Sequence, residues 1–158
     1  MICGVRYVHT NLIARDWCRL AAFYETLFGC IPVPPERDYS GPALDAGTGV
    51  PNATLCGVHL RFPGYDDDSG PTLEIYSYTP EENGPAPKVN RPGFGHIAFE
   101  VASVTDAQRE VLANGGTPVG EIVTLTTATG AHVTWCYVTD PEGNIIELQS
   151  WGSYGERK

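Results

Sequence analysis

Residues 9–29, HTNLIARDWCRLAAFYETLFG, carry the clearest structural signals in the chain. The first of these residues predict a short β-strand that carries His9, and the remainder predicts a helix over about 16–28. Asp16 is typical of a helix N-cap, and Gly29 is typical of the left-handed residue that follows a helix. The apolar residues of this helix recur at helical spacing, namely Leu20, Phe23, Tyr24 and Leu27.

The same plan occurs a second time in the chain. His96 follows His9 by 87 positions, and Gly116 follows Gly29 by the same interval. A second helix is predicted over about 104–114, closed by Gly115 and Gly116. Short strands separated by turn signals follow each helix, near 30–33, 54–62 and 72–78 in the first half and near 118–125, 131–138 and 144–150 in the second. Each half therefore reads β-α-β-β-β.

This repeat predicts an α+β fold made of two tandem βαβββ modules within one domain, residues 1–158. The first module covers about 1–78, the connector 79–93 and the second module about 94–151. The first module is longer because of a Pro/Gly-rich stretch, 34–53, which we expect to be a loop. A loop of this length either lines or covers a site, or is simply exposed at the surface.

Each half also pairs one histidine on its first strand with one glutamate on its last strand. The pairs are His9 with Glu74, and His96 with Glu147. Imidazole and carboxylate groups together suit a divalent transition metal, and nickel, cobalt, manganese, iron and zinc all accept this donor set. Four such residues that converge would form a metal centre.

Strand alternation predicts which face of each sheet carries these side chains. Successive side chains in a strand point to opposite faces. Glu74 is therefore expected on the face opposite Leu73 and Ile75, and Glu147 on the face opposite its two aliphatic neighbours in the strand. Asn11, Tyr76, Gln149 and Trp151 share the glutamate-bearing faces and are predicted to line a substrate pocket. His59 and His132 have no Glu at an equivalent position, so we expect them to be structural or pocket-lining.

The composition excludes several classes of partner. A net charge of −9 argues against nucleic acid and against an anionic membrane surface. No segment is long and apolar enough to span a membrane. The five cysteines show no paired spacing, which favours free thiols and a cytoplasmic protein. The small-molecule substrate that we expect is implied by the family resemblance that follows.

Four segments together resemble the vicinal oxygen chelate superfamily, which includes glyoxalase I, epimerases, extradiol dioxygenases and bleomycin- or fosfomycin-resistance proteins. They are HTNLIARDWCRLAAFYETLFG, LEIYSY, GFGHIAFEV and DPEGNIIELQ. The resemblance implies curled mixed sheets around a central cavity, a homodimer, and a divalent ion held by His9, Glu74, His96 and Glu147.

The resemblance also implies a reaction. Two His and two Glu look most like the ligands of glyoxalase I, a lyase that moves a proton through a metal-stabilised enediolate; epimerases are similar isomerases. Glu147 would be the catalytic base, with Glu74 as the second candidate. Glutathione is not specified, because the family's carboxylate-binding arginine is replaced by Ile13. The alternatives are a drug-binding resistance protein without catalysis and an iron-dependent extradiol dioxygenase.

Overall fold

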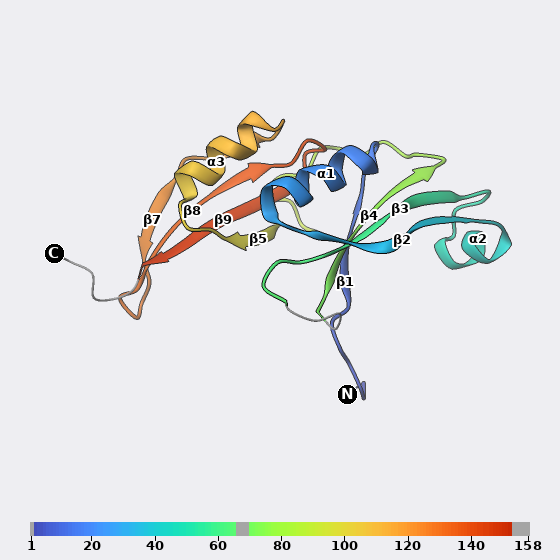
Figure 1. Ribbon diagram of the computed structural model, residues 1–158, viewed down its shortest axis with the longest axis horizontal. Helices are drawn as coiled ribbons and strands as arrows, with labels where there is room; N and C mark the ends of the chain where they lie inside the picture. The colour runs from blue at the N-terminus through green and yellow to red at the C-terminus, as the bar shows by residue number, and fades with distance from the viewer. Residues whose placement is uncertain (1, 66–69, 153–158) are drawn as a thin grey trace. The chain divides into compact units, whose positions relative to one another are not determined.

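The structure is a computed structural model that describes residues 2–65 and 70–152 (Figure 1). The chain divides into two compact units, Met1–Gly84 and Pro85–Lys158. The boundary between them falls within the predicted connector 79–93.

Unit 1 is a four-stranded sheet with one long helix and one short helix. Its elements are β1 (His9–Ile13), α1 (Trp17–Phe28), β2 (Ile31–Ser40), α2 (Pro42–Thr48), β3 (Thr54–Arg61) and β4 (Thr72–Thr79). The strand order is β1-β4-β3-β2. Strand β1 runs parallel to β4, whereas the β3–β4 and β2–β3 pairs are antiparallel.

Helix α1 begins and ends where the sequence predicts. The Asp16 carboxylate accepts a hydrogen bond from the backbone N–H of Arg19 at 2.9 Å, which satisfies one of the free amides of the first turn. Gly29 closes the helix with φ at 67°, a conformation that costs glycine little. The helix packs on β3 and β4 through Leu20 and Tyr24, both fully buried (Figure 1).

The Pro-rich stretch 34–53 is not the loop that we expected. Strand β2 continues through it to Ser40, and α2 follows directly. The prolines are accommodated because β2 is an edge strand whose pairing register with β3 shifts between Val33 and Arg37. Edge strands and bulges are the places where a sheet tolerates a residue without an N–H.

Unit 2 repeats this plan with a five-stranded sheet and one helix. Its elements are β5 (Ile97–Glu100), α3 (Val104–Ala113), β6 (Thr117–Pro118), β7 (Val123–Thr126), β8 (His132–Thr139) and β9 (Ile145–Gly152). The order is β5-β9-β8-β6, and β7 also pairs with β8. Helix α3 lies along β8 and β9 (Figure 1).

The single strand expected over 118–125 is divided into β6 and β7. Both segments pair with β8, but the register changes between them, so the residues around Gly120 bulge out of the ladder. The turn between β8 and β9 is as predicted: the buried carboxylate of Asp140 accepts hydrogen bonds from the backbone N–H groups of Glu142 and Asn144, both at 2.9 Å.

Each sheet has one apolar face under its helix and one face with polar side chains. Leu73 and Ile75 of β4 are fully buried, as are Ile146 and Leu148 of β9. The alternation predicted for these strands is therefore confirmed, and so is the α+β fold of two curled mixed sheets. Among the described residues, each helix is too short or too polar to cross a lipid bilayer.

Candidate functional site

The polar face of unit 1 is organised around Glu74. In the ladder Asn11 pairs with Glu74 on one side and His59 pairs with it on the other, so the three residues form one row across β1, β4 and β3. Neighbours in such a row project from the same face of the sheet. Glu74 itself is 9% exposed, and a carboxylate this buried needs partners.

Two histidines and an amide surround the Glu74 carboxylate. Its Oε1 lies 3.2 Å from Nδ1 of His9 and 3.1 Å from Nε2 of His59. Its Oε2 accepts a longer hydrogen bond from Nδ2 of Asn11 at 3.5 Å. Both oxygens are thus occupied, which offsets the cost of burying the charge.

Tyr76 extends this cluster along β4. Its hydroxyl lies 2.6 Å from Nε2 of His59. Burial, reinforced by the Glu74 charge, raises the pKa of Tyr76 to about 12, so the phenol stays protonated at neutral pH. Burial also lowers the pKa of His59, and this effect exceeds the opposing attraction of Glu74. His59 therefore favours the neutral imidazole, the form that can bind a metal.

His59, which we expected to be structural or pocket-lining, has a carboxylate partner that its position in the repeat did not indicate. It contacts the same carboxylate oxygen as His9 does. Alternation along β3 alone does not reveal this contact, because it depends on how β3 and β4 are aligned. The signal that could have found it was a pairing of 54–61 with 72–79 as a hairpin, which places His59 opposite Glu74.

Unit 2 carries the second predicted pair on its own polar face. His96 comes just before β5, and its Nε2 lies 3.1 Å from Oε2 of Glu147 on β9. Tyr137 pairs with Glu147 in the ladder, and its ring centroid is 5.1 Å from that of His96. Burial, followed by the charge of Glu147 and a hydrogen bond to it, raises the pKa of Tyr137. The aromatic row continues to Trp135, whose ring centroid is 5.0 Å from that of Tyr137.

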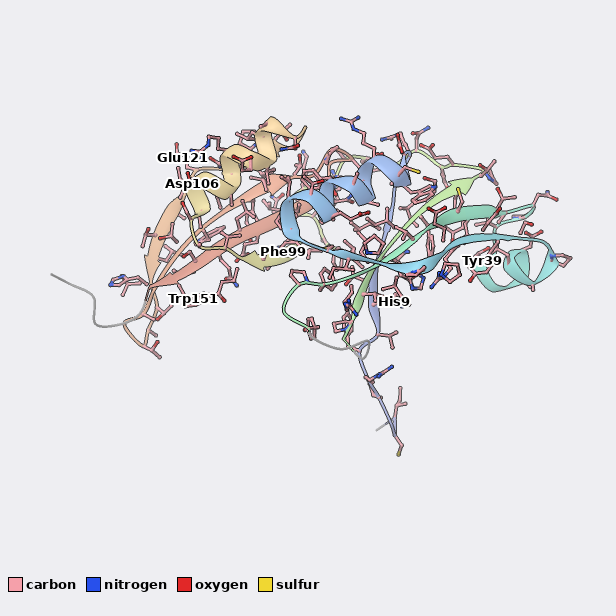
Figure 2. The ribbon with its side chains drawn as sticks, in the orientation of Figure 1. His9, Tyr39, Phe99, Asp106, Glu121 and Trp151 are labelled. Atoms are coloured by element: carbon pink, nitrogen blue, oxygen red, sulfur yellow. The ribbon has the colours of Figure 1, made fainter. Side chains whose placement is uncertain are left out.

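The four predicted pocket residues lie on these same two faces. Asn11 and Tyr76 are part of the Glu74 cluster in unit 1. Gln149 and Trp151 alternate with Leu148 on β9 and so share the face of Glu147; Trp151 is 48% exposed near the end of the strand (Figure 2). His9 lies at the start of β1 in the same view. That these residues line a substrate pocket stays a prediction.

The donor atoms of each pair are spaced as metal ligands can be. Zinc ligands sit about 2.0–2.2 Å from the ion, so neighbouring ligands are about 3 Å apart in octahedral and about 3.5 Å apart in tetrahedral coordination. The N–O separations of 3.1–3.2 Å suit this spacing as well as they suit a hydrogen bond. Within the part of the chain that the structure describes, no three or more His, Cys, Asp or Glu side chains form a group arranged to hold an ion. Binding of one ion by both pairs stays a prediction.

Comparison with known proteins identifies the family. The family model of the Glyoxalase/Bleomycin resistance protein/Dioxygenase superfamily matches residues 6–148. The chain belongs to this superfamily. A comparison with curated proteins gave no match.

Solved structures support the same fold. A glyoxalase family protein from Bacillus cereus is similar, with a TM-score of 0.80 and 17% identity, over 97% of this chain and 100% of that chain. A glyoxylase/bleomycin resistance protein/dioxygenase domain from Frankia sp. gives a TM-score of 0.54 and 18% identity, over 99% and 96%. A virulence protein from Salmonella typhimurium gives 0.53 and 23%, over 96% and 100%.

The family resemblance inferred from the four sequence segments is thereby confirmed. The Glyoxalase/Bleomycin resistance protein/Dioxygenase superfamily contains enzymes, and its name alone spans several activities. Membership therefore does not select one of them, and the choice depends on the side chains of the two polar faces.

Proposed function

We propose that this chain is a metal-dependent, glyoxalase I-like lyase or isomerase that transfers a proton within a small oxygenated substrate. The observation that carries the proposal is the repeated His–Glu pair. His9 contacts Glu74 at 3.2 Å in unit 1, and His96 contacts Glu147 at 3.1 Å in unit 2. Each pair lies on the polar face of its sheet, opposite the aliphatic side chains that are buried under the helix.

His9, Glu74, His96 and Glu147 would hold the ion, which would be nickel, cobalt, manganese, iron or zinc. A bound divalent cation supplies Lewis acidity toward the substrate oxygens, which acidifies the neighbouring C–H. Two carboxylates balance the charge of such an ion. In this proposal His59 is not a metal ligand. It contacts Oε1 of Glu74 and keeps that carboxylate in place.

The base that moves the proton is assigned to Glu147. Glu74 is fixed by contacts with three side chains, whereas Glu147 contacts His96 and Tyr137 among the described residues. The Glu147 side chain is also the more exposed of the two, at 18% against 11%. A carboxylate with fewer partners and more access is better able to reach a substrate carbon. Glu74 remains the second candidate, and a homodimer stays a prediction.

Removal and replacement of the ion test this proposal. The purified protein would be screened against thiol hemithioacetals and acyl-CoA epimers before and after chelation. Because a Lewis acid contributes several kcal/mol to such a reaction, turnover should fall by at least about a thousandfold on chelation and return with one of the five metals.

Other outcomes would contradict the proposal in distinct ways. Turnover that chelation leaves unchanged would exclude a metal-dependent reaction. Metal-dependent oxygen uptake with catechols, in place of proton transfer, would assign the chain to the dioxygenases. Tight binding of a panel compound with no product formed would assign it to the resistance-type binding proteins.

A further inference from the structure

A second row of residues lies beside the Glu74 cluster on the polar face of unit 1. Arg37 of β2 pairs with Gly57 of β3, and Gly57 pairs with Tyr76 of β4. Because Tyr76 and Glu74 are two residues apart on one strand, this row and the Glu74 row project from the same face. Arg37 therefore belongs to the face that carries the candidate site.

Gly57 places no side chain between Arg37 and Tyr76. A Cβ atom at this position would lie 2.4 Å from Cδ1 of Tyr76, so the tyrosine ring occupies the place where a side chain would be. The ring thus leans across β3 toward the arginine. The positive charge of Arg37 also acts on the site, because it lowers the pKa values of both Tyr76 and His59.

The guanidinium of Arg37 has a nitrogen that lacks a partner. Nη1 is buried, and no hydrogen-bond acceptor among the described residues contacts it. Arginine keeps its charge in proteins, and buried N–H groups almost always have an acceptor. Glu74, the buried carboxylate of this face, has its two oxygens in contact with His9, His59 and Asn11.

We propose that Arg37 binds an oxyanion of the substrate, a carboxylate or a phosphate, on the polar face of unit 1. The planar guanidinium matches the geometry of both anions. Tyr39, two residues farther along β2, projects from the same face and is close enough to Tyr76 to affect its pKa.

This assignment rests on the proposed function in one respect, namely that the bound anion is part of the substrate. It specifies an anionic compound whose charged group lies at Arg37 while its oxygenated carbon lies toward His9 and Glu74. The net charge of −9 does not oppose this, because recognition of the anion depends on one local cation.

Anion titration of the metal-free protein tests the assignment without any catalytic readout. The probes are acetate and inorganic phosphate at constant ionic strength, with the arginine side-chain N–H signals followed by NMR. The Arg37 signal should shift saturably with one of them, and the probe that acts identifies the anion as a carboxylate or a phosphate. Arg37→Gln should weaken the binding by roughly ten- to a hundredfold, the range expected for a hydrogen bond to a charged group.

Two variants make the result specific. Arg19→Gln removes the same charge from the exposed surface of α1 in the same unit and should leave binding unchanged. Arg37→Lys keeps the charge but not the planar fork and should give an intermediate affinity. No saturable shift with either probe, or equal binding by wild type and Arg37→Gln, would overturn the assignment. Because the protein is metal-free throughout, the outcome is independent of whether the metal-dependent reaction occurs.

Discussion

Replacement of Glu147 by Gln is expected to lower turnover by about 10²- to 10⁴-fold, the usual contribution of a positioned acid–base group. The amide keeps an oxygen at the position 3.1 Å from Nε2 of His96, so part of the metal affinity should survive. It cannot accept a proton from carbon, because an amide is far too weak a base. Activity and metal content should therefore separate in this variant.

The matched control for this variant is Glu121→Gln. Glu121 is exposed, belongs to the same unit and lies outside β9 (Figure 2). Its replacement by Gln removes the same charge. Steady-state kinetics on the substrate found by the panel, together with the bound metal per chain, gives both readouts. Undiminished turnover in Glu147→Gln would end its assignment as the base, and a full loss in Glu74→Gln alone would transfer the role to Glu74.

Replacement of Gly57 by Ala is expected to destabilise the fold by about 1–3 kcal/mol or more, as other overpacked cores are. The new Cβ would lie 2.0 Å from the backbone oxygen of Ile75, which is fixed in the β4 ladder, and 2.4 Å from Tyr76. The ring of Tyr76 would have to move, and its contact with His59 would be lost with it. One added methyl group should therefore lower the free energy of unfolding and also break the contact between His59 and Tyr76.

Urea unfolding followed by fluorescence measures this effect, and Gly47→Ala is the control. Gly47 lies within α2, where an added Cβ meets nothing within 4 Å, so alanine there should stabilise by about 0.5–1 kcal/mol through its helix propensity. Two identical substitutions are thus expected to act in opposite directions. An unfolding midpoint for Gly57→Ala equal to that of wild type would contradict the packing described here.

Local patterns in the sequence were sufficient for much of the fold. The cap at Asp16, the left-handed Gly29 and the alternation around Glu74 depend on residues close together in the chain, and all three are found as predicted. The repeat of His and Gly positions identified two similar modules for the same reason. Each of these signals reports on a strand or a helix by itself.

Pairing between strands could not be predicted in the same way. His59 contacts Glu74 because β3 and β4 align at those residues, and neither strand by itself indicates that register. Arg37 was missed because the prolines of 34–53 suggested a loop, whereas an edge strand with a register shift accommodates them. The row of Arg37, Gly57 and Tyr76 is therefore visible only in the folded sheet.

These two additions change the chemistry expected of unit 1. The sequence predicted one histidine and one glutamate there, and the folded sheet adds a second imidazole on the same carboxylate oxygen and the guanidinium of Arg37, whose Nη1 is buried. The first holds the carboxylate in place, and the second introduces a positive charge. An acidic chain thus acquires a local site for an anionic small molecule.

A single metal centre is tested by the metal content of His9→Ala and His96→Ala beside that of wild type, after each protein is loaded with each of the five candidate metals and the excess is removed. Loss of a direct ligand should cost more than the roughly 10- to 100-fold typical of outer contacts. Wild type and the control His132→Ala should retain one ion per chain, and each of the two variants should retain almost none. A wild type that binds no ion, or variants that each lose only half of the bound metal, would contradict a single centre held by both pairs.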